Sequence, residues 1–222
     1  MRWMLPLFCW GLLAQVADKA NENYKSEQGR ANIGRSLGSK DRNERQKPAE
    51  LIRAMGLGPG MTVADVGTGI GYMLPFLSQA VGPAGAVYAE DIFPDFLEKA
   101  RATVAEAGLK NTTFVLGSDT ETKLPEGLFD VVLVLDVYHH FDYPEKMLAS
   151  IAKALKPEGR LVVVEYHKKP EAMAGGRAME HVRLGAEAAT AEIEGHGFRL
   201  LTMRDHVPDV QWMGIFRKPM AH

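Results

Sequence analysis

Short apolar runs alternate with segments of helical periodicity through the middle of the chain. The runs predict strands at residues 61–66, 86–90, 112–116, 129–135 and 161–165. The segments between them predict helices at residues 71–81, 93–107 and 144–155, which end near glycine or proline. Strands that alternate with helices form βαβ units, so we expect a parallel sheet with right-handed crossovers. The run at 129–135 is almost wholly apolar, which predicts a strand that is covered on both faces.

The pattern changes after the last of these strands. A polar segment at 167–183 precedes a predicted helix at 186–195, and two apolar stretches follow at 198–203 and 211–216. The link between the two stretches is too short for a crossover helix, so we expect them to pair antiparallel. The predicted fold is therefore α/β: a Rossmann-like, doubly wound and mostly parallel sheet with helices on both faces.

The first residues form an apolar run behind a single positive charge. Arg2 precedes the apolar residues 3–14, and the small residues Ala14 and Ala17 follow. The run suits the apolar part of a signal peptide and is shorter than the about 20 residues that span a bilayer. We expect an export signal at residues 1–20, with a buried or amphipathic N-terminal helix as the alternative, and we exclude these residues from the fold.

Residues 21–47 are polar and irregular, and the glycines and serines of residues 32–40 predict a loop. A helical pattern begins at residue 41 and runs to residue 55, with Pro48 expected in a first turn. The main domain is expected to span residues 48–218.

Composition narrows the possible functions. The 222 residues are 46% hydrophobic and 24% charged, which is enough for one sizeable core. The net charge of −2 argues against a strongly basic nucleic-acid binder. The single cysteine, Cys9, lies outside the predicted core, which excludes a disulfide framework, a thiolate metal site and a core cysteine nucleophile.

A glycine-rich turn follows the first predicted strand. Its sequence, Gly67-Thr68-Gly69-Ile70-Gly71, has the spacing G-x-G-x-G and not the G-x-G-x-x-G of dinucleotide-binding folds. Asp65 lies two positions before the first glycine, where its carboxylate would repel a pyrophosphate and could accept from an ammonium group. Asp91 lies at the end of the second strand, where a ribose diol is usually held.

With these features, residues 45–218 resemble the class I S-adenosylmethionine-dependent methyltransferases, most closely the small-molecule "type 11" branch. The resemblance is carried by residues 63–72, 87–92, 129–136 and 155–165. It implies a seven-stranded sheet whose last strand is antiparallel, and S-adenosyl-L-methionine as the cofactor.

The same resemblance implies a set of cofactor-binding residues. The glycines would shape the pocket for the methionine end, Asp65 would hold its amino group, and Asp91 would take the ribose hydroxyls. Glu90 is a less favoured ribose ligand, because one step along a strand reverses the face. Ile92 would pack on the adenine, and either Ser118 or Asp119 would contact it. The full set is Asp65, Gly67, Thr68, Gly69, Gly71, Asp91, Ile92, Ser118, Asp119 and Asp136.

Methyl transfer from a sulfonium needs in-line positioning and, for a protonated acceptor, a base. Ligands in open parallel sheets lie beyond the carboxyl ends of the strands. The candidate catalytic residues at those ends are His139 and His140, together with Tyr138, Glu165 and His181. Glu165, His140 and His181 could converge, and we favour a proton relay or acceptor hydrogen bonding over a metal there.

Residues 41–48 lid the cofactor in similar sequences, and Arg42 and Arg45 could hold an acidic acceptor or lie on a solvated face. Sequence marks of base-methylating enzymes are absent, so we expect a small-molecule acceptor. The alternatives are a catalytically silent binding or scaffold protein of the same fold, an RNA or protein methyltransferase and, more weakly, an NAD(P)-dependent oxidoreductase. Localisation stays open, because the leader suggests export whereas the cofactor is made in the cytoplasm.

Overall fold

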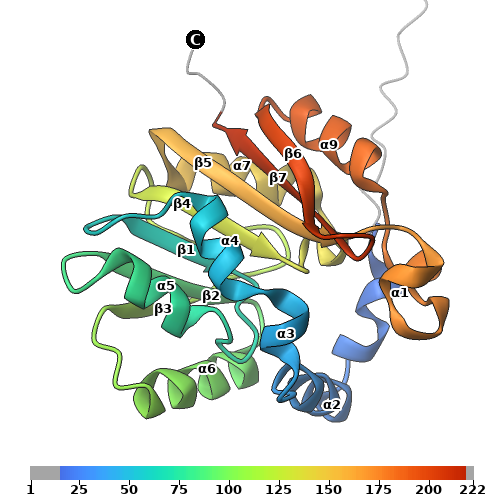
Figure 1. The fold of residues 1–222 in the computed structure, drawn as a ribbon, viewed down its shortest axis with the longest axis horizontal. Helices are drawn as coiled ribbons and strands as arrows, with labels where there is room; N and C mark the ends of the chain where they lie inside the picture. Colours follow the sequence, from blue (N-terminus) through green and yellow to red (C-terminus); the bar gives the residue numbers. More distant parts are fainter. Residues whose placement is uncertain (1–15, 219–222) are drawn as a thin grey trace, which may run out of the picture.

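The computed structural model describes residues 16–218 of the chain, and within them one seven-stranded sheet forms the centre of the molecule (Figure 1). The strand order is β3-β2-β1-β4-β5-β7-β6. The strands are β1 (Thr62–Val66), β2 (Ala86–Asp91), β3 (Thr112–Leu116), β4 (Phe129–Leu135), β5 (Leu155–Tyr166), β6 (Arg199–Val207) and β7 (Gln211–Arg217). The last strand, β7, runs antiparallel to both β5 and β6, which confirms the predicted C-terminal hairpin.

Helices cover both faces of the sheet (Figure 1). The α-helices are α1 (Asp18–Asn21), α2 (Glu27–Leu37), α3 (Arg42–Gln46), α4 (Pro48–Met55), α5 (Leu74–Val81), α6 (Pro94–Glu106), α7 (Pro144–Ala154), α8 (Ala178–His181) and α9 (Ala186–Gly195). Single 3-10 turns lie at η1 (Glu22–Tyr24), η2 (Tyr138–His140), η3 (Pro170–Ala172) and η4 (Ala174–Gly176). The polar segment at 167–183, after β5, holds η3, η4 and α8.

Strand β4 divides the core into two apolar clusters. Val131 and Leu133 pack in the cluster that contains residues of α4, α5 and α6, whereas Val132 and Val134 pack in the one that contains residues of α7 and α9. Successive side chains of a strand point to opposite faces, so an apolar residue at nearly every position is what a doubly covered strand requires. The prediction for residues 129–135 is confirmed.

The N-terminal region is more helical than predicted. Helix α2 occupies most of the segment expected to be a loop, so that prediction is wrong. Ser26 caps the helix by accepting a hydrogen bond from the backbone N–H of Gly29 at 3.1 Å. Arg30 forms an ion pair with Asp95 of α6 at 2.9 Å, a contact between distant segments that no local pattern reveals. The predicted helix over residues 41–55 is interrupted by Lys47, at φ 44°, and Pro48 begins α4.

Residues before position 21 also belong to the folded part, contrary to the exclusion of the first 20 residues. Ala17 and Ala20 are buried, and the backbone N–H of Ala17 donates to Asp142 at 3.2 Å. The rest of the predicted export signal, with Cys9, lies outside the described residues. Within residues 16–218, none of the helices has the length and apolar character needed to cross a membrane.

Candidate active site

A cavity of about 310 Å³ lies at the carboxyl ends of β1, β2 and β4. Its walls come from the glycine-rich turn, from the residues that follow β2 and β4, and from the N-terminal helices. Ligands of doubly wound sheets bind at this edge, where the strand order reverses direction. The order β3-β2-β1-β4-β5 places that reversal between β1 and β4, so the cavity lies where the fold predicts a ligand site.

The glycine-rich turn needs its glycines for two reasons. Gly67, Gly69 and Gly71 have φ of +72°, +56° and +80°, a region that other residues rarely adopt. A Cβ on Gly67 would also lie 2.6 Å from Val137, and one on Gly71 would lie 3.1 Å from the backbone of Ala100. Gly67 and Gly69 line the cavity. Gly71, by contrast, allows the turn to pack closely against α6.

Two adjacent carboxyl groups at the end of β2 line the cavity. Asp91 accepts hydrogen bonds from the backbone N–H groups of Gly69 at 2.9 Å and Phe93 at 3.0 Å. Glu90 accepts one from Gly67 at 3.3 Å, while its Oε1 is buried without a hydrogen-bond partner in the described structure. The alternation of faces along β2 was expected to turn Glu90 away from the ligand, but Glu90 lines the cavity together with Asp91. Gly117 leaves the room for this carboxylate, since a Cβ there would be 1.8 Å from Oε1.

Two further acids are held by side chains, and of these Asp136 lines the cavity whereas Asp65 does not. Asp65, beneath the turn, accepts from the Thr68 hydroxyl at 2.8 Å. Asp136 follows β4 at φ 56° and accepts from Gln46 of α3 at 2.8 Å and Gln211 of β7 at 2.6 Å. Neither glutamine was predicted, because neither belongs to a motif and only the fold brings them to Asp136.

Burial shifts the pKa of these carboxyl groups upward. It raises the pKa of Asp65 to about 7, that of Asp91 to about 6 and that of Asp136 to about 7, and it raises the pKa of Glu90 well above its usual value. Repulsion between the neighbouring acids adds to the effect of burial, whereas Arg42 opposes it at Asp65 and Asp136. A cavity with buried acids favours a ligand that carries hydroxyl and ammonium groups.

Arg42 and Arg45 have different surroundings. Arg42 lines the cavity, stacks over Tyr72 at 3.9 Å from the ring centroid and donates to the carbonyl of Leu37 at 2.9 Å. Arg45 is exposed and pairs with Asp41 at 3.0 Å within its own helix. Of these two arginines, only Arg42 is therefore in position to contact a ligand in the cavity.

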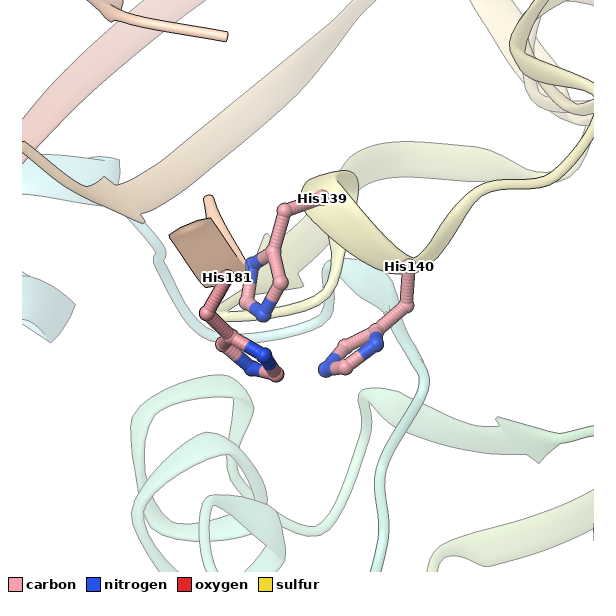
Figure 2. A group of neighbouring side chains, drawn as sticks. All are labelled: His139, His140 and His181. Atoms are coloured by element: carbon pink, nitrogen blue, oxygen red, sulfur yellow. The ribbon is translucent and has the colours of Figure 1, made fainter. Parts of the chain in front are cut away.

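Three histidines meet beside the cavity. His139 and His140 lie on η2 and His181 ends α8, and candidate ring nitrogens of the three lie within 4.8 Å of one another. Figure 2 shows the three rings turned toward one another. Glu165 was expected to join His140 and His181, but it contacts His139 instead, with its Oε2 2.6 Å from Nδ1.

The two neighbouring histidines are each held by one acceptor. Glu165, only 1% exposed, also accepts from the backbone N–H of His139 at 3.1 Å and from that of Tyr166 at 2.6 Å. His140 places its Nδ1 2.8 Å from Oδ1 of Asn21. Burial lowers the pKa of His140 well below its usual value and that of His181 to about 4, so both rings are neutral at neutral pH.

The remaining predicted residues divide between the cavity and the core. Ile92, Ser118 and Asp119 line the cavity. Tyr138 does not: its hydroxyl donates to Glu192 of α9 at 2.6 Å and its ring packs in the core. Its place in the sequence next to the histidines was misleading, because successive residues of η2 point in different directions. Sequence analysis also missed Tyr24 and Phe96, aromatic residues that line the cavity.

Comparison with known proteins identifies relatives of this site and fold. A family profile described as "Methyltransferase domain" of the Methyltransf_11 type matches residues 64–163. The ubiquinone/menaquinone biosynthesis C-methyltransferase UbiE of Ectopseudomonas mendocina is 32% identical over 118 residues, which are 53% of this chain and 46% of that protein. The demethylmenaquinone methyltransferase of Lactococcus lactis is 34% identical over 119 residues, again 53% and 46%. The matches thus span about half the length of these relatives.

Solved structures extend the similarity to most of the chain. A SAM-dependent methyltransferase from Aquifex aeolicus superposes with a TM-score of 0.76 and 28% identity, over 84% of this chain and 97% of that one. A putative methyltransferase in complex with the Haloferax volcanii Trm112 activator gives a TM-score of 0.73 over 91% and 99%. At 18% identity this second likeness shows the shared fold alone.

Proposed function

Because the chain belongs to the class I S-adenosylmethionine-dependent methyltransferases, in the type 11 branch, we propose that it transfers a methyl group from S-adenosylmethionine to a small-molecule acceptor. The observation that carries the proposal is the cavity itself, in which the glycine-rich turn and buried carboxyl groups face one space. The reaction is an in-line displacement at an already activated methyl group, so the protein supplies positioning and exclusion of water.

The proposed cofactor contacts follow from the groups that line the cavity. The carboxyl groups of Glu90 and Asp91 are placed to accept from ribose hydroxyls, with the unpartnered Oε1 of Glu90 as the strongest support. Asp65 and Asp136 are the proposed acceptors for an ammonium group, directly or through water. Ile92 lines the cavity and is 38% exposed, so its side chain is available to pack on an adenine.

The acceptor is proposed to lie on the aromatic side of the cavity. Tyr24, Phe96, Phe141 and Met147 line it there, beside His140. The rings of Tyr24 and His140 contact each other with centroids 4.7 Å apart. These walls favour a largely apolar or aromatic acceptor, in keeping with relatives named as acting in ubiquinone and menaquinone biosynthesis.

The lowered pKa of His140 limits what this residue does alone. A neutral imidazole far from its titration range is a weak general base, because efficient proton transfer needs a pKa near the operating pH. We therefore propose His140 as a residue of the acceptor side of the site and assign it no general-base role.

Calorimetric titration of the full chain with S-adenosylhomocysteine, S-adenosylmethionine and NADH tests the proposal. We expect saturable binding of the two adenosyl compounds only. Asp91→Ala removes a carboxyl group at the cavity wall and should weaken that binding by at least about tenfold, or 1.4 kcal/mol. Glu187→Ala, on the exposed first turn of α9, is the matched control and should bind as the wild type does.

Each other outcome has a defined meaning. A folded sample that binds neither adenosyl compound would support the silent scaffold alternative. Binding of NADH alone would mean that the glycine-rich turn serves a dinucleotide. Wild-type affinity in Asp91→Ala would remove this residue from the cofactor site.

A further inference from the structure

The three histidines beside the cavity lie together, and one of them has a buried ring nitrogen without a hydrogen-bond partner. His139 is 3% exposed, and its Nε2 has no hydrogen-bond partner among the described residues. A buried nitrogen without a partner loses its interaction with water and gains nothing in return. The rings of His140 and His181 lie near this nitrogen, with centroids 4.0 and 4.8 Å from the His139 ring.

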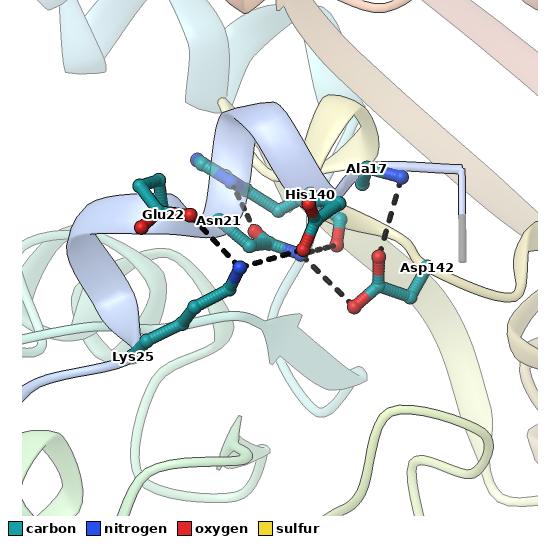
Figure 3. A network of polar contacts seen from close by, with 7 residues as sticks. Ala17, Asn21, Glu22, Lys25, His140 and Asp142 are labelled. Atoms are coloured by element: carbon teal, nitrogen blue, oxygen red, sulfur yellow. Dashed lines mark hydrogen bonds and ion pairs between the residues drawn. The ribbon is translucent and has the colours of Figure 1, made fainter.

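The hydrogen bonds behind the rings determine which nitrogen carries the proton. The carboxylate of Glu165 only accepts, so Nδ1 of His139 is the donor, and in the neutral ring the lone pair is then on Nε2. The amide nitrogen of Asn21 donates to the His140 carbonyl at 3.0 Å and to Asp142 at 3.2 Å. That orients the amide oxygen toward Nδ1 of His140 (Figure 3). An amide oxygen can only accept, so Nδ1 of His140 is the donor. His140 therefore also keeps its lone pair on Nε2.

We propose that His139, His140 and His181 bind a divalent transition-metal ion, with zinc as the reference ion. Three neutral imidazoles are a common ligand set for a catalytic zinc ion, which leaves a fourth position open. Ligating histidines almost always donate their other ring N–H to a carboxylate or carbonyl group, as His139 does to Glu165 and His140 does to Asn21. Both the ligands and their supports are present.

The spacing of the rings fits a site that contracts on binding. Ligand nitrogens at about 2.0–2.1 Å from a tetrahedral zinc ion lie about 3.3 Å apart, so candidate ligand nitrogens separated by up to 4.8 Å need small side-chain rotations. His181 provides this freedom, because it is partly exposed at the end of the short helix α8. Glu165 and Asn21 hold the other two rings, so most of the movement belongs to His181.

The open position would act on the acceptor, an extension that rests on the proposed function. His140 lines the cavity, so an ion on this residue lies at the cavity edge. An acceptor hydroxyl or thiol that binds such an ion releases its proton to solvent and stays as the coordinated oxyanion or thiolate. The metal would thereby activate the acceptor without a general base.

Metal binding by the full chain, with any affinity tag removed, tests the site directly. Zn²⁺ is titrated calorimetrically, and Co²⁺ is titrated by its visible absorption as a report of histidine coordination. We expect saturation at one ion per chain. His181→Ala should weaken Zn²⁺ binding by more than about 100-fold, whereas His196→Ala, an exposed histidine that caps α9, should leave it unchanged.

Glu165→Gln tests the support behind the ligand. A glutamine amide that donates to Nδ1 of His139 would place the ring proton on Nε2 and block coordination, so we expect a loss of about 10- to 100-fold. S-adenosylhomocysteine binding is measured on the same samples to show that they are folded. Metal binding without adenosyl binding would overturn the proposed function and keep the metal site. Equal Zn²⁺ affinity in the wild type and His181→Ala, or none in either, would overturn the metal site.

Discussion

Single atoms decide the shape of the cavity wall at Glu90 and Asp91, where the cofactor is proposed to bind. Glu90 keeps one carboxylate oxygen free only because Gly117, on the neighbouring β3 end, has no side chain. The backbone N–H of Gly117 donates to the Asp91 carbonyl at 3.1 Å, which holds the chain close to β2. A glycine outside the glycine-rich turn thus also shapes this wall of the cavity.

Gly117→Ala should therefore impair binding more than folding. The added methyl group displaces the end of the flexible Glu90 side chain, so we expect S-adenosylhomocysteine affinity to fall about tenfold, or 1.4 kcal/mol, with little change in the melting temperature. Gly195→Ala, where the methyl group meets nothing within 4 Å, is the matched control. Calorimetry and thermal unfolding measure both variants, and unchanged affinity in Gly117→Ala would separate Glu90 from the binding site.

Asp65 makes the stability of the ligand-free protein depend on pH. Its pKa is 3.8 when exposed and about 7 in the fold, so the folded state binds more protons between these values and loses stability as the pH rises through them. Asp65→Asn removes this loss. The free energy of unfolding of this variant, relative to that of the wild type, should therefore be higher at pH 8 than at pH 4, by at most about 4 kcal/mol. Urea unfolding at both pH values measures the difference, and a constant difference would show that Asp65 is ionised without penalty.

At the scale of elements, the sheet was predictable and helix α2 was not. Strands such as β4 are covered on both faces, so nearly every position of such a strand is apolar and the sequence alone predicts it. The short link after β6 likewise revealed the antiparallel hairpin. Helix α2 has a polar surface and only Gly34 buried, so it depends on contacts such as Arg30–Asp95 that join distant segments. The glycine-rich turn could be predicted because its residues are consecutive in the sequence. The histidine group could be predicted only in part, because His139 meets Glu165 and His181 through tertiary structure.

Helix α1 is expected to stabilise the edge of the site through Asn21. Asn21→Ala leaves Nδ1 of His140 and one oxygen of Asp142 without their partner, so we expect the free energy of unfolding to fall by about 1–3 kcal/mol. Asn23→Ala, an exposed neighbour in η1, controls for the loss of an asparagine. Urea unfolding compares the two variants, and equal stabilities would show that α1 is not held by this residue.

At the scale of the whole molecule, the cavity joins parts of the chain that are far apart in sequence. Its walls come from the N-terminal helices, the ends of β1, β2 and β4, and the segment after β3. A ligand in it contacts all of them at once, so binding should stabilise their arrangement as a unit.

Trypsin digestion measures this coupling. Lys25 and Arg42 line the cavity, so saturating S-adenosylhomocysteine should slow cleavage at both by at least about tenfold if the ligand stabilises this wall by about 1.4 kcal/mol. Lys110 is exposed in the turn before β3 and away from the cavity, so its cleavage rate is the internal control. Equal slowing at all three sites would indicate general stabilisation rather than closure of the N-terminal wall.

The carboxylate of Asp136, bound by Gln46 and by Gln211, has a consequence for how the protein is made. Gln211 begins β7, which follows β5 and β6 in the sequence and inserts between them in the sheet. Until β7 has emerged from the ribosome, the glycine-rich turn and the β2 acids are already present, but Asp136 lacks one partner and β5 lacks a neighbour. The wall of the cavity at Asp136 is therefore completed only after β7 has been synthesised.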